Sequence, residues 1–213
     1  MRARAGWLIC ILCAGFSGAA MADEVKQEAI DEMTDAAVQL FPMGRVFEMF
    51  ATEDPLWPLQ EKPDAITAEQ LSCVREELSQ PGYWRAKREE VVEYAEAHPD
   101  RFDDDLRLLR SGSAELLGKL VMGGVMSAQS GEPVDESELL AGVSNDQVLS
   151  MMTLVGDPDY ADLRRMTGLG ESMSPDQSKA QIEKSGYQKG FSLAARQMIK
   201  AMRSCDVPPS AYL

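Results

Sequence analysis

Histidine is almost absent from this sequence, in which His98 is the only one among 213 residues. A zinc site rich in histidine and a haem held by two histidines are therefore excluded within one chain. His98 stands directly before Pro99 at an expected helix junction, so we interpret it as a helix cap or a surface residue. The sequence also lacks a phosphate-binding glycine loop, a nucleophile elbow and a metalloprotease motif. We therefore expect a protein without a cofactor and without enzymatic activity.

Long apolar runs are missing as well. The most apolar stretch, 6–16, is too short to span a bilayer, which takes about 20 residues of helix. Arg2 and Arg4 precede this stretch and the small residues of Ala20-Met21-Ala22 follow it, as in a secretory signal peptide. We predict cleavage after Ala22, one domain over 23–213, and a periplasmic or secreted protein without stable membrane insertion.

Cysteine is scarce, with four residues in the whole chain. Cys10 and Cys13 lie in the predicted signal peptide, and each follows a large apolar residue, whereas a lipid anchor needs a small one there. Cys73 and Cys205 remain, and two cysteines in an exported protein favour a disulfide. The alternative is two separate buried thiols. A bridge would fasten the end of the last helix to an earlier one.

Basic residues are few compared with acidic ones. Residues 23–213 carry 19 lysines and arginines against 35 aspartates and glutamates, a net charge of −16. Such a surface repels phosphate backbones and anionic lipid headgroups, which excludes nucleic acid as a partner. A basic envelope protein or a basic secreted protein is a permitted partner.

The alternation of β-branched residues that is typical of strands is lacking, whereas apolar residues at helical spacing recur throughout. The sequence predicts an all-α fold, a single-domain bundle of roughly seven helices with one disulfide. The expected helices lie at 24–40, around 46–50, and at 67–78, 83–97, 99–128, 144–156, 158–167 and 175–204.

Several local patterns support these boundaries. Capping boxes are expected at Thr67 with Gln70, Ser144 with Gln147 and Ser174 with Gln177. In each pair, the side chain of one residue accepts a hydrogen bond from the backbone N–H of the other. Trp57, in a proline-rich loop, should pin that loop to the core. Within the long helix 99–128, Gly118, Gly123 and Gly124 predict a close helix crossing or a kink near Gly123-Gly124.

The segment DQVLSMMTLVGDPDYADLRRMTGL, at 146–169, resembles the C-terminal helical pair of a family of secreted bacterial proteins known as domain of unknown function 2059. Asp157-Pro158 matches the break between the helices of that family, and Leu163 matches the apolar position that follows. Thr153-Leu154 replaces the aromatic pair of the family, and Ala161-Asp162 stands near its glycine-lysine step. The resemblance implies an all-helical envelope protein of unassigned activity and supplies no catalytic residue.

Methionine is the abundant unusual residue, with eleven after position 22. Pairs at helical spacing can fill gaps in a core, bind copper(I), or line a cavity for a lipid-like ligand. The candidates for such a cavity are Met122, Met126, Met151, Met152, Met198 and Met202.

The densest acidic cluster comprises Asp100, Asp103, Asp104 and Asp105, where a helix is expected to begin. Negative charge at that end of a helix is favourable, so we interpret the cluster as structural rather than as a cation site.

The leading functional prediction is a binding or interaction protein of the cell envelope. The alternatives are a carrier of a hydrophobic molecule or soft metal in the methionine cavity, and a hydrolase that uses carboxylates alone.

Overall fold

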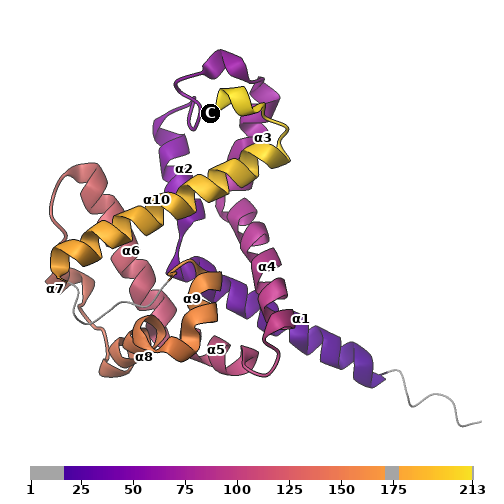
Figure 1. Cartoon of the computed structure of the whole chain (residues 1–213), viewed down its shortest axis with the longest axis vertical. Helices are drawn as coiled ribbons and strands as arrows, with labels where there is room; N and C mark the ends of the chain where they lie inside the picture. The colour runs from indigo at the N-terminus through magenta and orange to yellow at the C-terminus, as the bar shows by residue number, and fades with distance from the viewer. Residues whose placement is uncertain (1–16, 171–177, 213) are drawn as a thin grey trace, which may run out of the picture.

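The computed structural model describes residues 17–170 and 178–212, and within them the regular structure is helical without any strand (Figure 1). The predicted all-α bundle with one disulfide is confirmed. The structure has more helices than the roughly seven predicted, because a predicted long helix is divided and short helices occur in the connections. In chain order the α-helices are α1 (Ser17–Leu40), α2 (Met43–Glu53), α3 (Ala68–Leu78), α4 (Gln80–Ala97), α5 (Phe102–Leu108), α6 (Ala114–Ser130), α7 (Glu136–Leu139), α8 (Asn145–Gly156), α9 (Ala161–Thr167) and α10 (Lys179–Ser204).

Helix α1 lies at the centre of the core. Its predicted inward residues Ile30, Met33, Ala37 and Leu40 are all buried, and the helix packs against α4 and α6. These residues recur every three or four positions, which places them on one face of a helix. The apolar stripe of α1 therefore organises the bundle, as the sequence predicts. Among the described residues, no helix combines the length and the apolar character needed to cross a bilayer.

The predicted helix 99–128 is wrong as a single element. The chain forms α5, then a π-helical turn η2 (Leu109–Ser113), then α6, and Gly112 adopts a φ of +101° inside that turn. That backbone conformation is strained for any residue with a Cβ atom. The break therefore lies at Gly112, whereas Gly123 and Gly124 continue α6 without interruption.

Helix boundaries follow local capping chemistry. The boxes of Thr67 with Gln70 and of Ser144 with Gln147 are both present, at the starts of α3 and α8. Ser174 and Gln177 lie outside the described residues, and α10 begins at Lys179, later than predicted, where Ser178 and Gln181 form a box. Helix α4 begins at Gln80 rather than at 83, because Ser79 caps it and Pro81 occupies its first turn. Ser79 therefore ends α3 and begins α4.

The proline-rich loop between α2 and α3 is held by Trp57, as predicted. Its ring lies 5.6 Å from the ring of Phe47 and 6.1 Å from the ring of Phe50, measured between centroids. The Arg75 guanidinium of α3 donates to the carbonyl oxygens of Trp57 and Asp54 at 2.9 and 2.6 Å. The loop is thus fixed to both neighbouring helices.

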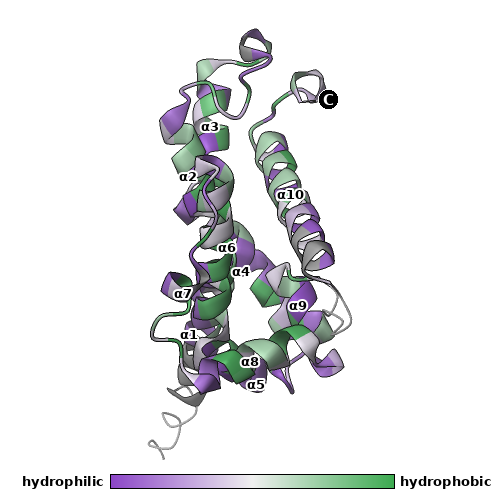
Figure 2. Ribbon diagram, turned by 90° about the vertical axis from the view of Figure 1, so that its left-hand side faces the viewer, coloured by the Kyte–Doolittle hydropathy of each residue, from purple (hydrophilic) through white to green (hydrophobic). Residues whose placement is uncertain are grey.

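The disulfide between Cys73 and Cys205 is present and joins α3 to the end of α10, with 5.8 Å between the two Cα atoms. Two hydrogen bonds secure the same region: Gln70 Nε2 donates to the Asp206 carbonyl at 2.7 Å, and Lys62 Nζ to the Ser210 carbonyl at 2.9 Å. Figure 2 shows α10 standing beside the column formed by α1, α4 and α6 rather than within it. Helix α10 is therefore anchored at its C-terminal end.

Candidate functional site

The six methionines proposed as cavity residues are divided between the core and the surface. Met202 is buried near the disulfide, and Met151 and Met198 are partly buried against the core. Met122 is half-buried on α6 beside α1 and α2, whereas Met126 and Met152 are 60% and 58% exposed. A buried and a largely exposed side chain cannot line the same enclosed cavity. The six methionines therefore do not line one enclosed cavity.

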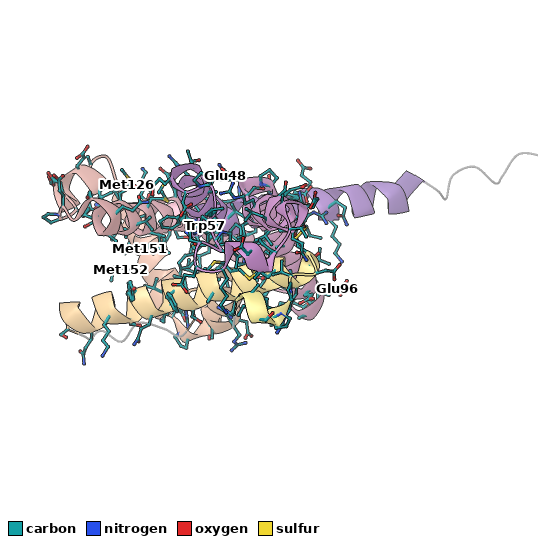
Figure 3. All side chains as sticks on the ribbon, turned by 90° about the horizontal axis from the view of Figure 1, so that it is seen from above. Glu48, Trp57, Glu96, Met126, Met151 and Met152 are labelled. Atoms are coloured by element: carbon teal, nitrogen blue, oxygen red, sulfur yellow. A yellow bond between two sulfur atoms is a disulfide. The ribbon has the colours of Figure 1, made fainter. Side chains whose placement is uncertain are left out.

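Several large apolar side chains on α8 and α10 are exposed. Leu149 on α8 is 61% exposed, and Tyr187 and Phe191 on α10 are 75% and 68% exposed. Figure 3 labels Met126 of α6 and Met151 and Met152 of α8, but α8 meets α6 at Glu115, about three helical turns from Met126. We call the two exposed aromatic side chains of α10, Tyr187 and Phe191, the apolar face. Large apolar side chains that are exposed next to each other are typical of interaction sites.

The apolar face is an uncovered part of the inward stripe of α10. Tyr187, Phe191, Ala194, Met198 and Met202 follow one another at intervals of three or four residues, so they share one side of the helix. Met202 is buried, and Ala194 and Met198 pack against the core. The same side is open to solvent at Tyr187 and Phe191. One helical surface is thus covered by the protein in its C-terminal half and left without a cover in its N-terminal half.

Charge is distributed very unevenly between α10 and the rest of the chain. Helix α10 contains six basic residues and one acidic residue, whereas the other residues of 23–213 comprise 13 basic and 34 acidic ones. Lys184, Arg196 and Arg203 are exposed on this helix. A basic helix on an acidic body creates a local positive potential that attracts acidic groups. The apolar face therefore has a positively charged border along α10.

His98 caps α4, which confirms one of its two predicted roles. Its backbone N–H donates to the Tyr94 carbonyl at 2.9 Å, and the Tyr94 and His98 rings lie 4.7 Å apart between centroids. Its Nε2 lies 3.8 Å from Oδ2 of Asp162 on α9. The histidine therefore links α4 to α9.

The buried residue of the predicted acidic cluster has a structural role. Asp105 is fully buried at the start of α5, where it accepts hydrogen bonds from the Tyr94 hydroxyl and, at 3.2 Å, from the Arg101 guanidinium. Asp104 pairs with Arg107 at 2.6 Å on the surface. Within residues 17–170 and 178–212, no three His, Cys, Asp or Glu side chains are grouped as a metal site would need. The cluster thus anchors α5 to α4.

Two buried tyrosines on α4 have strongly raised pKa values. Burial is the main cause for both; the negative charge of Glu90 adds to it for Tyr83, and the hydrogen bond to Asp105 for Tyr94. The Tyr83 hydroxyl has no hydrogen-bond partner among the described residues. Ionisation of either tyrosine in the folded protein is therefore strongly disfavoured.

We expect the free energy of unfolding to fall at alkaline pH. An unfolded tyrosine releases its proton near pH 10, whereas the folded protein retains the protons of Tyr83 and Tyr94 above that pH. Stability is therefore complete below pH 10 and decreases above it, by up to about 1.4 kcal/mol per pH unit for each tyrosine. Urea unfolding at pH 8.5 to 11 measures this slope, and Tyr94→Phe should reduce it. An unchanged slope in that variant would contradict the assignment.

Comparison with known proteins gives no match: no family model, curated protein or solved structure matches the chain. The segment 146–169 forms α8, the short 3-10 turn η3 (Pro158–Tyr160) and α9, with the break at Asp157-Pro158 as predicted. Its resemblance to domain of unknown function 2059 stays a prediction.

Proposed function

We propose that the chain is an exported, non-enzymatic binding protein of the bacterial cell envelope, most consistent with the periplasm, and that the apolar face is where its partner docks. One observation carries this proposal: the inward stripe of α10 continues past the core and exposes Tyr187 and Phe191. Burying large apolar side chains of this kind stabilises a complex by about 25 cal/mol per Å² removed from water, before the costs of association.

The partner that best fits this surface is an amphipathic helix of another protein, with an acidic side. The exposed rings of Tyr187 and Phe191 can pack against the apolar side of such a helix. Lys184 and the other basic residues of α10 complement acidic residues along its border. A basic partner, which the net charge of the whole chain permits, would instead bind the acidic surface away from α10.

The two alternative functions receive less support from the geometry. A carrier would enclose its ligand, but the candidate methionines lie partly in the core and partly on the surface. A glycoside-type hydrolase needs two carboxyl groups about 5 to 9.5 Å apart with different roles. Glu90 and Asp162, which face one cleft, are instead paired with Lys87 and Arg165. These ion pairs favour binding over hydrolysis.

The docking proposal predicts that Tyr187→Ser with Phe191→Ser abolishes partner capture. Mature protein would be immobilised and exposed to crosslinked envelope extract, and the retained proteins would be identified by mass spectrometry. Removing both rings exposes the partner's apolar side chains to water, so we expect at least a hundredfold loss of affinity for any partner that uses this face.

Leu56→Ser provides the matched control, because Leu56 is also exposed but lies in the loop after α2. It should leave capture unchanged. Capture that survives the double substitution, or an extract from which the wild-type protein retains nothing, would contradict docking at the apolar face.

A further inference from the structure

A second site lies apart from the apolar face, in a cleft between α4, α9 and α10. The cleft has a volume of about 440 Å³, in the size range that suits a small molecule. Helix α4 contributes Lys87, Glu90 and Glu93, and α10 contributes Arg196, Gln197 and Lys200. The ion pair of Lys200 with Glu89 joins these two walls directly.

Most of the charges around this cleft are already paired. Lys87 Nζ is buried and donates to Glu90 Oε2 at 2.5 Å and to the Met166 carbonyl at 3.1 Å. Arg165 pairs with Asp162 at 2.6 Å, and Lys200 pairs with Glu89 at 2.8 Å. These contacts hold α4 against α9 and α10, and they leave little free charge on the groups that make them.

Three groups in the cleft remain without a partner among the described residues. Gln197 is only 8% exposed, and its side-chain amide makes no hydrogen bond to a described residue. The polar atoms of this amide reach the cleft, so they are free to bond a ligand there. Arg196 and Glu93, which also line the cleft, form no ion pair with any described residue. The free groups are thus one cation, one anion and one amide.

We infer that this cleft binds a zwitterionic small molecule of amino-acid size. The Arg196 guanidinium offers two parallel N–H donors to a carboxylate, and the Glu93 carboxylate accepts from an ammonium group. The Gln197 amide, which both donates and accepts, serves the polar atoms between them. An anion without an ammonium group would leave the unpaired Glu93 carboxylate without a counter-charge, so the chemistry favours a ligand with both charges.

Isothermal titration of the mature protein with each of the twenty L-amino acids, up to 10 mM, tests this inference. We expect at least one to bind with a stoichiometry of one. Arg196→Gln and Gln197→Leu should each weaken that binding about tenfold or more, because each removes a hydrogen-bonding group of the site. Propionate and propylamine, which carry one charge each, should bind more weakly than the amino acid.

Two substitutions on the same helix serve as controls. Arg203→Gln and Gln188→Leu make the same chemical changes at exposed positions outside the cleft, and they should bind the amino acid as the wild type does. No binding by any amino acid would overturn the inference. Binding that is insensitive to Arg196→Gln and Gln197→Leu would show that the amino acid binds outside this cleft. Equally tight binding of propionate would show that the ligand does not need both charges.

Discussion

Removal of the Cys73–Cys205 disulfide is expected to lower the free energy of unfolding by about 4 to 5 kcal/mol. The bridge joins residues 132 positions apart, so it restricts the unfolded chain strongly. Loop-entropy models give about 5 kcal/mol for a closure of that length, and strain in the native state reduces the figure. Since a domain of ordinary stability has about 5 to 15 kcal/mol in total, this is a large share of it.

Urea unfolding of the wild type and of the double variant Cys73→Ala, Cys205→Ala, each with and without reductant, measures the loss. The starting material is protein from the periplasm of an expressing Gram-negative host, with an expected mass for residues 23–213 less two hydrogens. Reductant should destabilise the wild type and leave the double variant unchanged. Two thiols that alkylate in the denatured, unreduced wild type, or a loss below about 1 kcal/mol, would contradict the prediction.

The disulfide also connects stability with the two proposed binding surfaces. Helix α10 carries Tyr187 and Phe191 of the apolar face and Arg196 and Gln197 of the cleft, while its strongest fastening lies at Cys205. Chain regions with few buried contacts open locally at a low free energy. Loss of the bridge should therefore loosen α10 before the rest of the bundle, and both binding activities should weaken together.

The features that the sequence predicted well are those set by neighbouring residues. The capping boxes at Thr67 and Ser144 depend on side chains three positions apart, and the break at Asp157-Pro158 depends on the proline itself. The partner of Cys205 could be inferred because the signal peptide, if removed, leaves one other cysteine. None of these inferences requires knowledge of the tertiary structure.

The break at Gly112 could not be read from the apolar pattern, because that pattern continues across it. A Cβ atom on Gly112 would lie 2.3 Å from the Gln147 side chain of α8, so the turn is fixed partly by a distant helix. Likewise, helical periodicity identifies the inward side of α10 but does not tell how far along the helix the core extends. The exposure of Tyr187 and Phe191 is a tertiary result, whereas the basic charge of α10 could have been found by counting charges helix by helix.

Gly118→Ala is expected to destabilise the protein by about 3 kcal/mol, although alanine is the better helix former. Gly118 is buried where α6 crosses α1, and a Cβ atom there would lie 2.1 Å from the carbonyl oxygen of Gln39. That oxygen belongs to the backbone of α1, so no side-chain rotation can relieve the overlap and the two helices must move apart. Separation of α1 and α6 would open the packing around Leu40 and Leu117, which are both buried.

Gly124→Ala is the matched control for this prediction, because the same methyl group added six residues later on α6 meets no atom within 4 Å. There the higher helix propensity of alanine should act alone and stabilise the protein by up to about 1 kcal/mol. Urea unfolding of the two variants should therefore show changes of opposite sign from one chemical substitution. Equal effects at both positions would mean that α6 does not cross α1 at Gly118. The central packing of the bundle described above would then be contradicted as well. Opposite effects would assign the glycine at 118 to the contact between two helices and the glycine at 124 to no contact at all.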